Sequence, residues 1–245
     1  MANTTNLTDR QIKILKYIIE EYIETAKPVG SETLDKKFNL GVSPATLRNE
    51  MVTLTKNGYL KQVHTSAGRT PTPTALKYYV TNLMQPKNLS VTDEVKIKEK
   101  VWDYKQEFEK ALRQATQELA DNTKSLAVSA DNEGNEYFAG TANILAMPEF
   151  FDIDLTRNVL SLLDHFDFLN SIFAKTGNIA GTHILVGEDL GYDYLSPCAI
   201  IFKHFGIGKK TQGVIGVVGP YRLNYQRLVP AVGYFGSLID ELVTV

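Results

Sequence analysis

The sequence predicts an α+β protein with a helical N-terminal domain and a mixed C-terminal domain. Apolar residues recur at helical spacing through residues 1–84, whereas short strand-like runs and one terminal helix fill residues 126–245. Between them, Gln85-Pro86-Lys87-Asn88 is the best linker candidate, and a polar-rich long helix completes the connection over residues 85–125. A chain of 245 residues is long enough for two ordinary domains with their own cores.

Two helices are expected before residue 43. The first begins at a capping box, Thr8-Asp9-Arg10-Gln11, and ends at Pro28. Its apolar stripe consists of Ile12, Leu15, Ile19, Tyr22 and Ile23. Ser31 can cap a second, short helix whose buried positions would be Leu34 and Phe38.

A third helix carries the most informative pattern. Ser43 suits its N-cap, Pro44 suits its first position, and Gly58 ends it. Its apolar face consists of Leu47, Met51 and Leu54, and its opposite face of Thr46, Arg48, Asn49 and Thr53. The helix therefore has one side for a core and one side of small or hydrogen-bonding groups.

A basic hairpin is expected directly after this helix. A strand-like run from Tyr59 to His64 is followed by a turn at Ser66-Ala67-Gly68 and by an exposed Arg69. Three helices and a hairpin within about sixty residues fit a winged helix-turn-helix, whose third helix enters the DNA major groove while the hairpin contacts phosphates. Thr72-Pro73 then starts another helix.

The polar groups of this module are the candidate DNA contacts. Thr46, Arg48 and Asn49 are candidates for the groove face, where Arg48 would pair with guanine and Asn49 with adenine if they point at base edges. Neighbouring side chains on a helix point in different directions, so at least one of the three would contact phosphate or cap the fold instead. Ser43 is included because a helix N-terminus favours a phosphate.

The hairpin would add contacts to the DNA backbone or minor groove from Lys61, His64, Ser66 and Arg69. Simpler alternatives stay open, since His64 equally fits a turn-stabilising hydrogen bond, and Arg48 or Asn49 taken alone is more often a solvated surface residue. The agreement of caps, spacings and hairpin favours one architecture. The alternative function is a ligand- or protein-binding sensor whose winged helix contacts protein rather than DNA.

Charge divides the chain in the same way. Residues 1–88 hold 12 Lys and Arg against 7 Asp and Glu, a net charge of +5. Residues 89–245 hold 14 against 21, a net charge of −7. A polyanionic partner therefore suits the first part only.

Composition also bears on compartment and redox chemistry. Cys198 is the only cysteine, which excludes an intramolecular disulfide and fits a reducing cytoplasm. It lies in an apolar run, so a small buried hydrophobe is predicted rather than a nucleophile. Residues 1–10 have no apolar core of a secretory signal, and no apolar stretch approaches ~18 residues, so neither secretion nor a membrane span is expected.

No pattern for catalysis or metal binding is visible. The four histidines are far apart and lack the HxxxH or HExxH spacing of metal sites: His64, His165, His183 and His204. Gly213-x-x-Gly216-x-x-Gly219 lies inside a strand pattern, so close packing explains it better than a nucleotide loop. The sequence therefore predicts no enzyme, no metal and no cofactor.

The long helix is expected from Ser90 or Thr92 to roughly Lys124. Its apolar residues step by three and four at Val101, Tyr104, Phe108, Leu112, Ala115 and Leu119. This stripe fits a coiled-coil seam for dimerisation or, equally, a face that packs on its own domain.

Beyond Ser125 the pattern is mixed. Strands are expected near residues 127–129, 136–139, 183–186, 198–205 and 213–218, and helices near residues 141–145, 155–173 and 225–242. The predicted arrangement is an antiparallel sheet with helices on one side.

Several stretches resemble the family of the heat-inducible transcription repressor HrcA. In the N-terminal domain they are Pro28-Val29-Gly30-Ser31, Gly41 to Met51, and His64 to Arg69 with Pro71-Thr72. In the C-terminal domain they are Gly140 to Leu145, Pro148-Glu149-Phe150, and Gly213 to Pro220 continuing through Arg222 and Tyr225 to Arg227. Together they cover most of residues 7–84 and 137–243.

The resemblance implies a bacterial repressor of chaperone genes, built from a winged-helix domain and a GAF-like domain. It also implies a homodimer that binds an inverted-repeat operator of double-stranded DNA, called CIRCE, on the nucleoid in the cytoplasm. A GroEL-type chaperonin is thought to keep members of the family active, until unfolded proteins occupy it.

The chain also departs from the family. Typical members are longer and carry an inserted dimerisation domain before the Gly140 stretch, whereas here only eight residues separate Val128 from Tyr137. A shortened member with a reduced GAF-like sheet is therefore expected.

Overall fold

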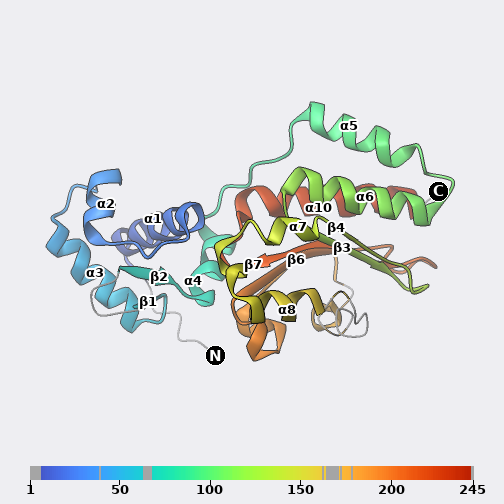
Figure 1. Ribbon diagram of the computed structural model, residues 1–245. Coiled ribbons are helices and arrows are strands. Elements are labelled where there is room, and N and C mark those ends of the chain that lie inside the picture. The colour runs from blue at the N-terminus through green and yellow to red at the C-terminus, as the bar shows by residue number, and fades with distance from the viewer. Residues whose placement is uncertain are drawn as a thin grey trace. The chain divides into compact units, whose positions relative to one another are not determined.

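The computed structural model describes residues 7–38, 40–62, 68–161, 163, 171, 173–177 and 179–243. The chain divides into two compact units, Met1–Met84 and Gln85–Val245 (Figure 1). Both units combine helices with antiparallel strands, so the predicted α+β class is confirmed. Within the described residues, no helix is both long enough and apolar enough to cross a membrane.

The N-terminal unit consists of three helices, a short hairpin and a further helical segment. Its elements are α1 (Asp9–Thr25), α2 (Ser31–Phe38), α3 (Pro44–Lys56), β1 (Leu60–Gln62), β2 (Arg69–Pro71), α4 (Pro73–Tyr78) and a π-helical turn (Tyr79–Leu83). The strands β1 and β2 are antiparallel, with Leu60 opposite Pro71. Val29 forms an isolated bridge with Arg69, so the segment before α2 lies beside the hairpin.

α1 is the centre of this unit, and the capping box at Thr8 and Gln11 begins it as predicted. α1 contacts α2, α3, α4 and β2, which explains why its burial extends beyond the predicted stripe to Ile14 and Ile18. Phe38 at the end of α2 is half-buried and stacks on Tyr17, with 4.2 Å between ring centroids.

The C-terminal unit is built on a five-stranded antiparallel sheet with strand order β4-β3-β7-β6-β5. The strands are β3 (Leu126–Asp131), β4 (Glu136–Ala139), β5 (Thr182–Val186), β6 (Cys198–Phe205) and β7 (Gly213–Pro220). Ser129 in β3 lies opposite Tyr137 in β4 and Ile215 in β7, which fixes the register. This mixed arrangement is consistent with a GAF-like domain.

Helices cover both faces of this sheet (Figure 1). One face carries α6 (Phe108–Thr123) and α10 (Tyr225–Val243). The other carries α7 (Thr141–Ile144), α8 (Ile153–Ser161) and the 3₁₀ turns Pro148–Phe151, Ala174–Thr176, Gly187–Leu190 and Asp193–Leu195. The prediction of helices on one side was therefore wrong, because β6 and β7 are apolar and buried on both faces and need two covering layers. Of the helix expected at 155–173, residues 162, 164–170 and 172 lie outside the described residues.

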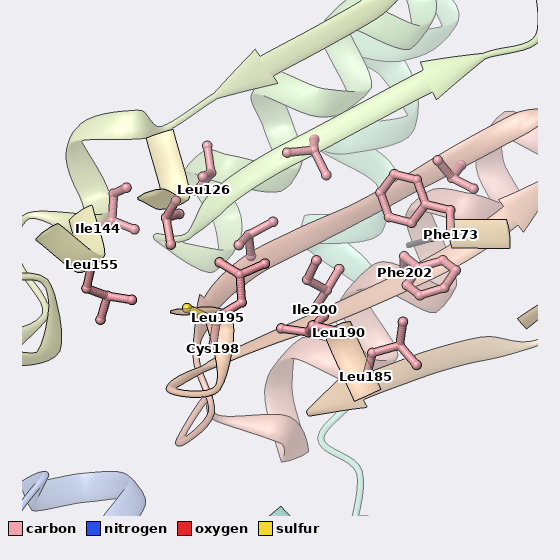
Figure 2. Packing of buried hydrophobic residues seen from close by; sticks show 14 of the residues in the cluster. Leu126, Ile144, Leu155, Phe173, Leu185, Leu190, Leu195, Cys198, Ile200 and Phe202 are labelled. Atoms are coloured by element: carbon pink, nitrogen blue, oxygen red, sulfur yellow. The ribbon is translucent and has the colours of Figure 1, made fainter. Parts of the chain in front are cut away.

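The core between the sheet and α7 and α8 is continuous. Figure 2 shows Leu126, Ile200 and Phe202 of the sheet together with Ile144 and Leu155 of the covering helices. Cys198 belongs to the same cluster and is 1% exposed, so its predicted role as a small buried hydrophobe is confirmed. Burial raises the pKa of its thiol to about 12, so the thiol stays protonated at neutral pH.

The predicted long helix is broken. The structure has α5 (Val91–Trp102) and α6 joined by a turn over residues 103–107, and the two helices pack against each other. The turn is closed by short-range hydrogen bonds from the amides of Tyr104, Lys105 and Glu107 to the carbonyls of Val101, Trp102 and Tyr104, respectively. Residue spacing did not reveal the break, because a turn between Val101 and Phe108 preserves the interval of seven.

This packing also decides between the two alternatives for the apolar stripe. Val101, Leu112, Ala115 and Leu119 are each 0% exposed within their own chain. Phe108 contacts Phe205 of β6 at 5.9 Å between centroids, and Tyr104 is 40% exposed in the turn. The stripe therefore packs on its own domain, and the prediction of a coiled-coil dimer seam was wrong in this conformation.

Close packing explains the three glycines of β7, as predicted. A Cβ added at Gly216 would lie 2.6 Å from Cβ of Phe202 and against the carbonyl oxygen of Ile201. Gly213 and Gly219 are similarly blocked, by the backbone of Ala130 and the side chain of Leu223. A side chain larger than hydrogen at Gly216 would force β6 and β7 apart.

The interior of α10 contains a proline, Pro230. Pro230 has no N–H to donate to the carbonyl of Gln226 one turn earlier. The backbone N–H of Lys87 donates to that carbonyl instead, at 2.7 Å. The segment before α5 is therefore hydrogen-bonded to α10.

We expect Gly216→Ala to lower the free energy of unfolding by about 1–3 kcal/mol, because the new methyl group overlaps β6 backbone and the Phe202 side chain. Urea denaturation followed by circular dichroism measures the change. Gly233→Ala in α10 is the control, since its new Cβ would come no closer than 3.2 Å, to Oγ1 of Thr182. Equal stability of the Gly216 variant and wild type would contradict the packing argument.

Candidate nucleic-acid interface

The N-terminus of α3 is capped by side-chain hydrogen bonds. Ser43 has extended backbone geometry, and its Oγ accepts from the amide of Thr46 at 3.2 Å. The Ser43 and Thr46 hydroxyls are also 3.0 Å apart. Thr46 is half-buried and tied to the cap, so of the three groove candidates it is the one that caps the fold.

The sides of α3 are divided as the spacing predicts. Leu47 and Leu54 are 0% exposed, and Met51 is 4% exposed. Arg48 and Asn49 are both exposed to solvent. Val52 and Lys56, which follow Arg48 at intervals of four, are exposed as well and extend the same outer face. Neither residue was among the predicted site residues, although the interval of four from Arg48 could have identified them.

Glu50 fixes the rotation of α3 in the unit. Its carboxylate accepts hydrogen bonds from Nε2 of Gln11 at 3.0 Å and from Nη1 of Arg10 at 3.4 Å. The acidic side chain of α3 is therefore turned toward α1, away from Arg48 and Asn49. The contact of Glu50 with α1 was not predicted from the sequence. The only indication of it was that Glu50 is the single carboxylate among neutral and basic residues in α3.

A hollow of about 540 Å³ opens beside this outer face. We call it the α2–α3 hollow, and its lining residues are Gly30, Ser31, Glu32, Thr33, Arg48, Met51, Val52, Gln62, Gly68 and Arg69. The start of α2, the outer face of α3 and the hairpin all contribute. Two guanidinium groups and one carboxylate line it, and the first amides of α2 add partial positive charge.

Arg69 is more enclosed than predicted. Its backbone N–H and C=O pair with Val29 at 2.8 and 2.9 Å, and its Nε donates to Oγ1 of Thr55 at 3.1 Å. The side chain is half-buried rather than exposed, because Thr55 holds it at the end of α3. Gly68 allows this crossing, since a Cβ there would overlap the backbone of Val29.

The remaining hairpin candidates are only partly described. Lys61 lies on β1 and is exposed. His64 and Ser66 lie outside the described residues. The structure thus gathers Arg48 and Arg69 around one hollow, with Asn49 on the adjoining face and Ser43 at the start of the same helix.

The C-terminal stretches of the family resemblance are structural ties. Arg222 donates to Glu149 through Nε at 2.5 Å and Nη2 at 3.0 Å, and both side chains are largely buried. Nδ2 of Asn143 donates to the carbonyl of Ser125 at 3.0 Å. These bonds join segments far apart in sequence, so this set of motif residues holds the sheet and its covering helices together. Spacing alone did not predict the pairing.

Comparison with known proteins supports the resemblance. The family described as "HrcA protein C terminal domain" matches residues 49–229. A relative from Symbiobacterium thermophilum, named "Heat-inducible transcription repressor HrcA", is 25% identical over 336 residues, covering 96% of this chain and 98% of the relative. One of the same name from Desulforamulus reducens is 27% identical over 326 residues, covering 92% and 94%.

A solved structure shares the fold across both units. It is described as "Crystal structure of a hypothetical protein at 2.2 A resolution" and aligns with a TM-score of 0.74 at 21% identity. The alignment covers 97% of this chain and 98% of that chain.

These comparisons place the chain among proteins whose named relatives are transcription repressors. It belongs to the HrcA family of heat-inducible transcription repressors. The alignment with the Symbiobacterium relative spans 336 positions, more than the 245 residues present here, so that relative carries residues with no counterpart in this chain.

Proposed function

We propose that this chain represses heat-shock (chaperone) genes by binding a CIRCE-type inverted-repeat operator as a homodimer. In this proposal the N-terminal unit acts as a winged helix-turn-helix. One observation carries the proposal: α3 leaves Arg48 and Asn49 exposed while its only acidic side chain, Glu50, is bonded to α1. An outer face of this composition suits the negative potential and base edges of a major groove.

Base recognition falls to Arg48 and Asn49 in this proposal. A guanidinium can donate two hydrogen bonds to O6 and N7 of guanine, and a carboxamide can bond N6 and N7 of adenine. Adjacent residues on a helix differ in direction by about 100°. The two side chains therefore point in different directions within the groove and would contact different base pairs.

Phosphate contact falls to the residues around the α2–α3 hollow. The first amides of α2 and the guanidinium of Arg69 both favour an anion there. Because Thr55 already positions Arg69, a phosphate contact costs that side chain little additional entropy. Ser43 brings a second helix N-terminus to the same interface.

Two copies are required by the symmetry of an inverted repeat, since each half-site takes one winged helix. The homodimer and the GroEL-type chaperonin that maintains activity in the family form part of this proposal. The aliphatic residues Val101, Leu112 and Leu119 do not supply the interface in this conformation, because they are buried within their own chain.

A gel-shift with the inverted repeat upstream of the chaperonin genes tests the proposal. We expect a discrete complex that scrambled competitor DNA does not displace, and light scattering at the same protein concentration should give twice the 27.3 kDa chain mass. Adding chaperonin should strengthen the shift. A protein without preference for the repeat would point instead to a sensor whose winged helix binds protein.

We expect Arg48→Ala to weaken operator binding by about 1–3 kcal/mol, because it removes a two-pronged base contact. Fluorescence anisotropy with labelled operator measures the loss, and discrimination against scrambled DNA should fall with it. Lys13→Ala is the control, since it removes one exposed charge from α1 in the same unit. Unchanged affinity and unchanged sequence preference would exclude Arg48 from base recognition.

We expect Arg69→Gln to weaken all DNA sequences alike and to lower the slope of log K against log salt by about 1, because one phosphate contact is lost. Thr55→Val is the matched control. It removes the hydroxyl that holds Arg69 but leaves the charge, so its salt slope should equal that of wild type. A loss confined to the operator sequence would contradict the phosphate role.

A further inference from the structure

α5 is attached to the C-terminal unit by little buried surface. Two of its residues, Ile97 and Val101, are buried, against eight in α6 and nine in α10. On its outer side, Val91 is 76% exposed and Val95 is 51% exposed. Segments with few buried apolar contacts open at lower free energy than the core of the same domain.

Ion pairs make up much of the attachment. Lys98 lies 2.7 Å from Glu241 of α10, and both side chains are about half exposed, at 48% and 52%. Lys100 lies 2.8 Å from Glu118 of α6, and hydrogen bonding to this carboxylate raises the pKa of Lys100. The Lys98–Glu241 pair is open to solvent on both sides and contributes little to stability. In the second pair only Lys100 is exposed, at 58%, whereas the Glu118 side chain is 11% exposed.

Two hydrogen bonds to backbone carbonyls also join the segment of residues 87–102 to α10. The hydroxyl of Tyr234 donates to the carbonyl of Glu94 at 2.7 Å. The amide of Lys87 donates to the carbonyl of Gln226 in α10, at 2.7 Å. All of these contacts lie along one arm, residues 87–102, which directly follows the N-terminal unit.

The attachment of this arm sets the length of the tether between the two units. The N-terminal unit ends at Met84, so Gln85 and Pro86 alone separate it from the anchored amide of Lys87. Release of α5 would extend the tether to the turn at residues 103–107. The effective concentration of a tethered domain falls roughly as the −3/2 power of tether length.

We propose that α5 is a heat-releasable clamp that keeps this tether short. The clamp rests on the proposed function, since a short tether matters when two N-terminal units must occupy two half-sites of one operator. Warming detaches α5 before the sheet unfolds, the tether lengthens, and operator affinity falls on the order of 10-fold. Regulation by heat then begins at this arm rather than in the winged helix.

Hydrogen exchange of the full-length protein at increasing temperature tests the clamp, with operator affinity measured over the same range. We expect amides of residues 91–102 to lose protection several degrees below those of residues 108–123. The fall in operator affinity should coincide with this first step and precede global unfolding.

Substitutions in α5 should shift the temperature at which residues 91–102 lose protection, some upward and some downward. Lys98→Gln combined with Lys100→Gln removes both ion pairs and should lower both the exchange step and the temperature of operator release. Val95→Ala should raise both, because alanine is the stronger helix former and the valine is half exposed. Lys96→Gln with Lys105→Gln removes the same charge from exposed positions and should leave both temperatures unchanged.

The outcomes separate the clamp from the repressor function. The clamp would be overturned if the amides of α5 lost protection only at the temperature at which those of α6 do. It would also be overturned if α5 lost protection early and operator affinity did not fall. Absence of operator binding at every temperature would instead refute the proposed function, and the coupling with it.

Discussion

The rotation of α3 about its own axis is the constraint on which the outer surface of the N-terminal unit depends. Leu47 and Leu54 bury one side of the helix, and the carboxylate of Glu50 is held by Gln11 of α1. Rotating α3 by one residue would bury Arg48 and expose a leucine. The burial of the leucines and the hydrogen bond between Glu50 and Gln11 must therefore favour the same rotation of the helix. Because both contacts favour the same rotation, the residues that pack the core also determine that Arg48 and Asn49 face solvent.

Much of this unit could be predicted from sequence because its signals are local. The cap at Ser43 and the apolar interval that includes Leu47 each involve residues within one or two turns. The enclosure of Arg69 could not be predicted, because it depends on Thr55 and Val29, which become neighbours only after the hairpin folds back. The hollow beside α3 escaped prediction for the same reason, since three separate segments line it.

The C-terminal unit shows where periodicity is ambiguous. The interval of seven between Val101 and Phe108 suits one continuous helix and equally two helices joined by a turn. The helical hairpin is preferred because folding back lets Ile97 and Val101 pack against α6, whereas a straight helix would leave them exposed. Strand positions were easier to predict, because a glycine such as Gly216 within an apolar run indicates a strand that packs closely against its neighbours. The Glu149–Arg222 pair had no local signal at all.

Pro230 illustrates how a local cost in one element can organise another. An interior proline has no N–H to donate to the carbonyl of Gln226 one turn earlier, so α10 lacks one of its usual backbone hydrogen bonds. Polar backbone groups inside a folded unit are nearly always hydrogen-bonded, so a donor from another segment is favoured at this carbonyl. The amide of Lys87 is that donor, and it belongs to the segment that leads out of the N-terminal unit. A residue that interrupts the hydrogen bonding of α10 thereby lets a segment distant in sequence bond to that helix, and this bond joins the start of the connecting arm to the packing of α10 within the C-terminal unit.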